Sequence, residues 1–149
     1  MQRILCALDG SPNERNVLAA AVALARKLGG KLILFHAVSL PVPLPPSALA
    51  VPPDDVGVML ADEARAHLAE IVRDVPPELI ERVRVEIGVP WRAVCDAAET
   101  AKADLIVVGS HGYGGVDRLI GTTAAKIVNH ADCSVLVARA PFEVRTNNA

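Results

Sequence analysis

Short apolar runs alternate with longer amphipathic segments along this chain, and each kind of segment predicts one kind of element. The runs at 3–8, 31–38 and 105–108 are apolar on both faces, which is typical of strands buried inside a sheet. Segment 82–87 alternates apolar and charged positions, so we predict a strand near a sheet edge with one face in water. A short apolar run at 135–137 predicts a last strand.

Apolar residues at helical spacing fill the intervals between these runs. They predict helices at about 12–28, 60–72, 91–101 and 122–129. Capping signals mark two of the helix starts. Ser11 is followed three positions later by Glu14, which is the capping-box pattern, and Thr122 or Thr123 is expected to cap the last helix.

The alternation of strands and helices predicts the fold class. Strands joined through helices of ten or more residues form right-handed βαβ units and a parallel sheet covered on both faces. We therefore expect an α/β fold with an open, doubly wound five-stranded sheet in the order 3-2-1-4-5. Ligands of such sheets bind where the strand order reverses. Segments 9–11 and 109–115 would then face one crevice.

Composition narrows the class of protein. A chain of 149 residues with 52% hydrophobic and 21% charged residues predicts one globular domain, spanning 1–149. The net charge of −2 argues against nucleic-acid binding. The Pro-rich segment at about 39–57 predicts a long loop, either a lid or a partner-binding surface, and its prolines argue against a membrane-spanning helix.

Cysteine usage and the amino-terminal segment indicate a cytoplasmic protein. Cys6, Cys95 and Cys133 are far apart and odd in number, so we interpret them as small apolar residues in a reducing compartment. The first strand segment meets Asp9 too early for a signal peptide. No redox or zinc role is expected.

A glycine-rich loop carries the clearest functional signal. It runs from Gly109 to Gly115, directly after an apolar strand, and is followed by Gly121-Thr122-Thr123 at a helix start. Glycine lets main-chain N–H groups approach a ligand, and a helix N-terminus adds unpaired donors, so this combination predicts an anion site. The P-loop and Gly-x-Gly-x-x-Gly patterns are both absent, which disfavours a dinucleotide-binding enzyme.

Three separated segments together resemble the universal stress protein family over nearly the whole chain. They are Ala7-Leu8-Asp9-Gly10-Ser11, Leu34-Phe35-His36-Ala37-Val38, and Gly109-x-x-Gly112 followed after eight residues by Gly121-Thr122. Gly88-Val89-Pro90 and the segment 130–137 are also similar to that family. The gap between the second and third glycines is one residue shorter than is usual there.

The resemblance implies an ATP-binding site, a stress-response role and a dimer. Phosphates and ribose would be held by Gly109, Gly112, Gly121, Thr122 and Thr123, while Asp9 and the main chain of Ala7 and Ala37 would lie by the adenosine. Val108 completes the predicted site, together with His111, which we interpret as a phosphate-side contact or a simply exposed residue. From its chemistry, Asp9 could also help to hold a Mg²⁺ bound to the phosphates.

Three functions stay open on this reasoning. The first is an ATP-binding regulatory protein, whose homodimer pairs through the edge strand 135–137 and responds to the bound nucleotide. The second is a weak ATP hydrolase or phosphotransferase, for which the sequence offers only Asp9 and a lone His111. The third is an interaction scaffold that uses no nucleotide. We assign no catalytic residue and expect slow hydrolysis at most.

Overall fold

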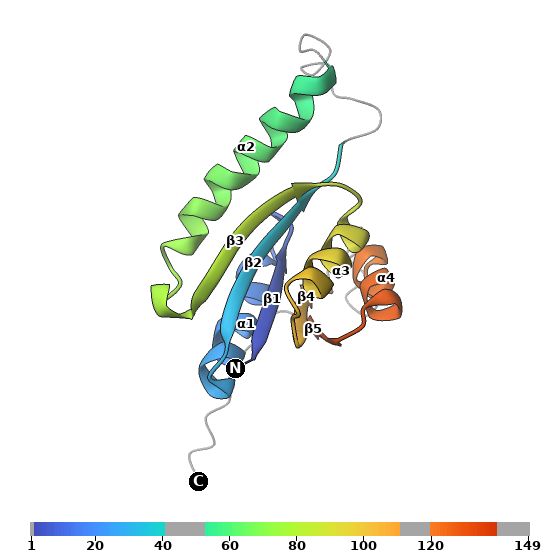
Figure 1. The fold of residues 1–149 in the computed structure, drawn as a ribbon. Coiled ribbons are helices and arrows are strands. Elements are labelled where there is room, and N and C mark those ends of the chain that lie inside the picture. The colour runs from blue at the N-terminus through green and yellow to red at the C-terminus, as the bar shows by residue number, and fades with distance from the viewer. Residues whose placement is uncertain (1, 41–52, 111–119, 140–149) are drawn as a thin grey trace.

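Five parallel strands form the centre of the protein in a computed structural model, which describes residues 2–40, 53–110 and 120–139. The strands are β1 (Arg3–Leu8), β2 (Lys31–Val38), β3 (Ile80–Ile87), β4 (Leu105–Gly109) and β5 (Ser134–Ala138). They lie in the order β3-β2-β1-β4-β5 with every neighbouring pair parallel, which confirms the predicted topology. The order reverses between β1 and β4 (Figure 1).

Helices cover both faces of the sheet. They are α1 (Glu14–Leu28), α2 (Pro53–Val72), α3 (Pro90–Thr100) and α4 (Thr122–His130), with a short 3₁₀ helix, η2 (Pro77–Leu79), between α2 and β3. In Figure 1, α3 and α4 lie together on one side of the strands, and α1 and α2 lie on the other. This is the doubly wound arrangement that the alternating pattern predicts.

Two buried clusters hold the layers together, one on each face. Successive residues of β1 belong to different clusters. Ile4 and Cys6 pack with α1 and α2, whereas Leu5 packs with α3 and α4. The separation follows from the two-residue period of a strand, which points successive side chains to opposite faces. Burial raises the pKa of the Cys6 thiol, so this cysteine is an inert core residue, as the sequence predicts.

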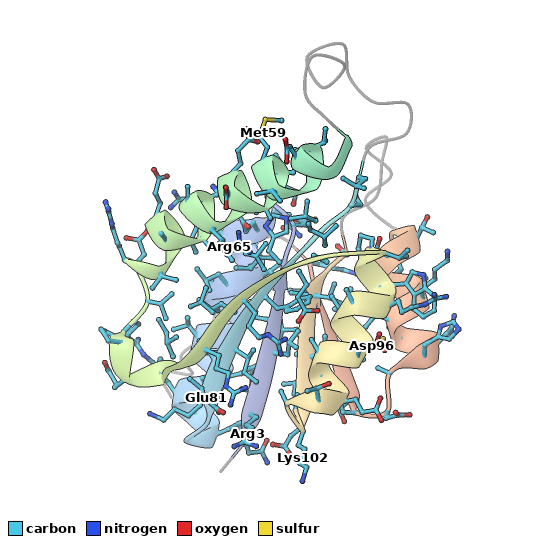
Figure 2. The ribbon with its side chains drawn as sticks, turned by 45° about the horizontal axis from the view of Figure 1, so that its top comes forward. Arg3, Met59, Arg65, Glu81, Asp96 and Lys102 are labelled. Atoms are coloured by element: carbon cyan, nitrogen blue, oxygen red, sulfur yellow. The ribbon has the colours of Figure 1, made fainter. Side chains whose placement is uncertain are left out.

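Strand β3 lies at the predicted sheet edge, but its exposure differs from the prediction, because apolar as well as charged residues face water. Val83 and Ile87 on its apolar face remain about half exposed, in contrast to the fully buried β1 and β2 interior. At the amino ends of the strands, Arg3 contacts Glu81 with 3.1 Å between Nε and Oε2 (Figure 2). This charged contact lies at the end of the sheet away from the ligand crevice that the strand order predicts.

Three local predictions are wrong. The N-cap of α1 is Asn13 and that of α4 is Gly121, and neither helix has a side-chain capping bond, so Ser11 and the two threonines do not cap. Helix α2 begins at Pro53, because proline suits a first turn where no N–H is needed, and the predicted loop 39–57 therefore ends earlier. Its central part, 41–52, lies outside the described residues.

Membrane insertion finds no support in the helices. Within residues 2–40, 53–110 and 120–139, none is both long and apolar enough to cross a bilayer.

Candidate functional site

A cavity of about 610 Å³ opens at the carboxyl ends of β1, β2 and β4, where the strand order reverses. The predicted site residues that line it are Ala7, Asp9, Ala37, Val108, Gly109, Gly121, Thr122 and Thr123. They come from three strand ends and from the start of α4. The other two predicted residues, His111 and Gly112, lie outside the described residues. The tertiary structure thus brings segments more than 70 residues apart in sequence to one crevice.

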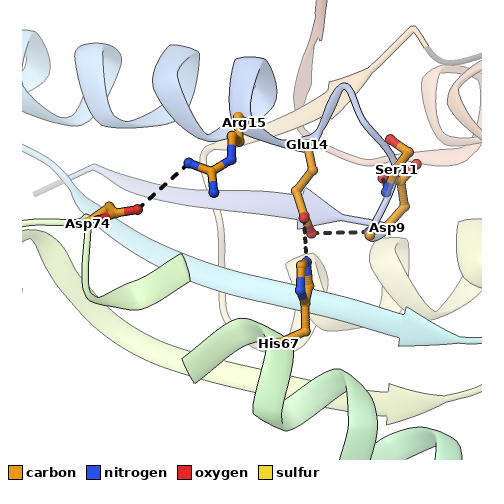
Figure 3. A network of polar contacts seen from close by, with 7 residues as sticks. Asp9, Ser11, Glu14, Arg15, His67 and Asp74 are labelled. Atoms are coloured by element: carbon orange, nitrogen blue, oxygen red, sulfur yellow. Dashed lines mark hydrogen bonds and ion pairs between the residues drawn. The ribbon is translucent and has the colours of Figure 1, made fainter. Parts of the chain in front are cut away.

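The turn between β1 and α1 forms one wall of this cavity. Gly10 has a φ of +72°, a left-handed conformation that glycine adopts without strain. The N–H of Ser11 donates to Asp9 Oδ1 at 2.9 Å, and the N–H of Gly10 donates to Glu14 Oε1 at 3.1 Å (Figure 3). These bonds replace the predicted capping box: Glu14 does reach back along the chain, but its partner is Gly10, one residue before Ser11.

The start of α4 forms the opposite wall. Gly121 is buried there as the N-cap, while Thr122 and Thr123 are exposed beside the cavity. Since no side chain caps this helix, the N–H groups of its first turn remain available to an anionic ligand, and the helix dipole adds a partial positive charge. This wall is the one suited to phosphate oxygens.

Two polar side-chain atoms of the cavity lining lack a partner. Ser11 Oγ and His36 Nδ1 are both buried and make no hydrogen bond with the described residues. Buried polar groups are nearly always hydrogen-bonded, so these two atoms are suited to bind a polar ligand in the cavity. Burial lowers the pKa of His36, while the negative charges of Glu14 and Asp9 act against this effect. The imidazole is therefore neutral at pH 7.

Sequence reasoning missed His36 and several apolar lining residues. His36 appears in the sequence only as part of the family-like segment 34–38, although its place at the end of β2 is a usable signal, because ligands of parallel sheets bind at that edge. Val17 of α1, Val94 of α3 and Ile120 supply apolar lining. An apolar pocket with a few placed polar groups is typical of a small-molecule site.

The chemistry available in the cavity favours binding. Asp9 contributes a carboxylate on the β1 side and α4 contributes main-chain donors on the other. Among the described residues, no group of three or more His, Cys, Asp or Glu side chains could hold a metal ion by itself. A Mg²⁺ could still bind through one carboxylate together with substrate phosphates.

Comparison with known proteins identifies the family. The model of the universal stress protein family matches residues 1–139 of the 149. The chain belongs to this family. A universal stress protein of Thermus aquaticus is 36% identical to it over 144 residues, covering 91% of this chain and 97% of that protein. The resemblance seen in the sequence is therefore confirmed over nearly the whole chain.

Solved structures show the same fold. A universal stress protein in complex with cAMP has a TM-score of 0.57 at 24% identity and covers 93% of this chain and 96% of its own. A second, from Archaeoglobus fulgidus and in complex with dAMP, has a TM-score of 0.61 at 18% identity and covers 93% and 98%. Both are adenine-nucleotide complexes of those proteins.

Proposed function

We propose that this universal stress protein binds an adenine nucleotide, with ATP as the favoured ligand, in the cavity between the β1–α1 turn and the start of α4. The observation that carries the proposal is the lining of that cavity. It combines an uncapped helix start, one carboxylate and unpartnered buried polar atoms with apolar walls. Two solved members of the family that hold cAMP and dAMP support the ligand class.

The two walls suggest how the nucleotide lies. The adenosine would occupy the β1–β2 side, where Asp9 can accept a ribose or base hydrogen bond and the main chain of Ala7 and Ala37 is close. The phosphates would lie against Gly109, Gly121 and the first turn of α4. A Mg²⁺ would be held by the phosphates with help from Asp9.

We also propose that nucleotide binding regulates a homodimer. Strand β5 is a sheet edge, and its residues Val135, Leu136 and Val137 are only partly buried. An edge strand leaves main-chain donors and acceptors unpaired, and two-fold pairing with a second copy would satisfy them. Sedimentation equilibrium at micromolar concentration, with and without ATP, measures this. A monomer under both conditions would refute the dimer.

The cytoplasm is the compartment we expect for this activity. Cys6, Cys95 and Cys133 are all free thiols in the structure. Free thiols are usual in a reducing compartment, and ATP is a cytoplasmic ligand.

Nucleotide binding is tested on the purified protein. Denaturing the wild type and analysing the released small molecules by mass spectrometry should reveal ATP or ADP. Titration calorimetry with ATP and Mg²⁺ then compares Asp9→Ala with Asp62→Ala, a control that removes an exposed carboxylate of α2 bonded only within its helix. We expect about tenfold weaker binding for Asp9→Ala alone. No released nucleotide and no binding by the wild type would favour a nucleotide-independent scaffold.

A further inference from the structure

Glu14 is a charged residue in an unusual place. Its side chain is 5% exposed, and it is the buried charged residue of the described part of the chain. Burying a carboxylate costs free energy unless its oxygens accept hydrogen bonds. The partners of Glu14 therefore matter for its role. Sequence analysis assigned Glu14 to a capping box, and the site described above uses it only as the acceptor for Gly10.

The carboxylate of Glu14 connects two elements. Oε1 accepts the N–H of Gly10 at 3.1 Å, and Oε2 lies 2.6 Å from Nε2 of His67 on α2 (Figure 3). The second contact joins residues 53 positions apart. Helix α2 is thereby bonded, through one side chain, to the main chain of the β1–α1 turn. We call the set Glu14, His67 and the Gly10 N–H the carboxylate brace.

The N–H that donates to Glu14 belongs to the residue with the left-handed conformation in this turn. Gly10 carries the left-handed φ of +72°, and its two neighbours, Asp9 and Ser11, both line the cavity. A rotation at Gly10 would move the Asp9 carboxylate and the unpartnered Ser11 hydroxyl together. His67 itself does not line the cavity, so it acts on a ligand there through neighbouring residues, and the turn is the one to which it is hydrogen-bonded through Glu14.

A nearby ion pair provides a matched comparison. Arg15 on α1 lies 3.9 Å from Asp74, just after α2, with side chains 85% and 70% exposed (Figure 3). This pair links the same two regions as the carboxylate brace but makes no contact with Gly10. Exposed pairs of this kind contribute little to stability.

We propose that Glu14 and His67 are positioning residues for the nucleotide site, which set the Asp9–Ser11 turn in its binding conformation and make affinity depend on α2. The inference rests on the proposed nucleotide binding. The carboxylate brace adds no contact to the ligand. It restricts the turn before binding, and preorganisation of this kind raises affinity by lowering the ordering cost.

The first experiment needs no nucleotide. Amide hydrogen exchange of Gly10 is measured by NMR in the wild type, His67→Ala, His67→Gln and Arg15→Gln. Loss of the imidazole should loosen Glu14 and speed exchange at Gly10 by about fivefold or more, because its acceptor is no longer held. Glutamine at position 67 keeps an N–H donor and should restore slow exchange. Arg15→Gln should match the wild type.

The second experiment measures affinity for ATP with Mg²⁺ by calorimetry in the same variants. His67→Ala should bind about tenfold more weakly, whereas His67→Gln and Arg15→Gln should stay within about twofold of the wild type. Thermal unfolding of each variant is recorded alongside. If His67→Ala acted only by lowering stability, the loss of affinity would follow the loss in melting temperature across the variants. His67→Gln would then not restore binding.

The outcomes separate the two proposals. If Gly10 exchange is the same in His67→Ala and the wild type, or if His67→Ala and Arg15→Gln weaken ATP equally, the positioning role is wrong while nucleotide binding stands. If the wild type binds no adenine nucleotide although Gly10 exchange depends on His67, the proposed function fails and with it the effect on affinity. Fast Gly10 exchange and weak ATP binding in His67→Ala, with both restored in His67→Gln, support both proposals.

Discussion

The two walls of the cavity are built in opposite ways. On one side, the β1–α1 turn binds its own polar groups: Asp9 accepts from Ser11, and Glu14 accepts from Gly10. On the other side, α4 begins at Thr122 without any side-chain cap, and its first threonines are exposed. One wall is held in shape by internal bonds, and the other keeps its donors free.

We expect the two walls to bind different parts of the proposed nucleotide. A turn whose conformation is held from within can position a few atoms accurately, which suits recognition of a base and a sugar. A helix start with open N–H groups is suited to an anion, whose charge it stabilises without needing one fixed geometry. We therefore expect substitutions in the turn to affect folding, and substitutions at the start of α4 to affect phosphate binding.

The largest expected effect is on stability. Glu14→Ala removes the acceptor of Gly10 and the partner of His67, so the free energy of unfolding should fall by about 2 kcal/mol. The double variant Thr122→Ala/Thr123→Ala removes two exposed hydroxyls that cap nothing, and should stay within about 0.5 kcal/mol of the wild type. Urea unfolding measures both. Equal losses would contradict the contrast between the walls.

The next effect concerns the ligand. The same threonine double variant should bind ATP about tenfold more weakly, because in the proposed complex the hydroxyls would donate to phosphate oxygens. Its affinity for adenosine, which lacks phosphates, should change by less than about twofold. Thr100→Ala, at the exposed end of α3, serves as the control. Calorimetry that finds adenosine and ATP weakened alike would show that α4 does not distinguish the phosphates.

A smaller effect is expected from the backbone of the turn. Gly10→Ala places a Cβ on a left-handed residue and should cost about 1 kcal/mol, although the space is sufficient, since His36 Cε1 would lie 3.8 Å away. Gly88→Ala is the matched control, because Gly88 lacks a positive φ and its added Cβ would also meet a neighbour at 3.8 Å. Thermal unfolding compares the two. A loss at Gly88 as large as at Gly10 would exclude backbone strain as the cause.

The smallest expected effect is the pH dependence that His36 gives to the free energy of unfolding. Burial lowers the pKa of His36 below its ordinary 6.5, so the unfolded chain binds this proton more readily than the folded chain. The contribution to stability is therefore complete above pH 6.5 and is lost as the pH falls from there toward the lower folded value. His36→Gln should show a smaller loss of unfolding free energy than the wild type over this range. Parallel curves for the two proteins would mean that His36 stays accessible to protons in the fold.

Strong repeating patterns made most of the fold predictable. The runs at 3–8 and 31–38 match β1 and β2, because a fully buried strand must be apolar on both faces. The edge position of β3 followed from its charged alternation. The resemblance to universal stress proteins also named cavity residues from separate segments, such as Asp9 and Thr122.

Local motifs were less reliable than these patterns. The Ser11 to Glu14 spacing fits a capping box, yet Glu14 is bonded to His67, whose position depends on how α2 packs. The threonines at the start of α4 fit a cap, yet Gly121 takes that place. In both cases a side chain had several possible partners, and the sequence pattern could not choose among them.

The sequence by itself determined the strand and helix periods, the α/β class and the family, because these depend on the spacing of apolar residues and on separated motifs. Only the tertiary structure decided which polar groups of the cavity are satisfied and which are left open. Glu14 is bonded to His67 across 53 positions, while Ser11 Oγ in the neighbouring turn has no partner among the described residues. Hydrogen bonds act over about 3 Å, so they are settled by packing that no local pattern encodes.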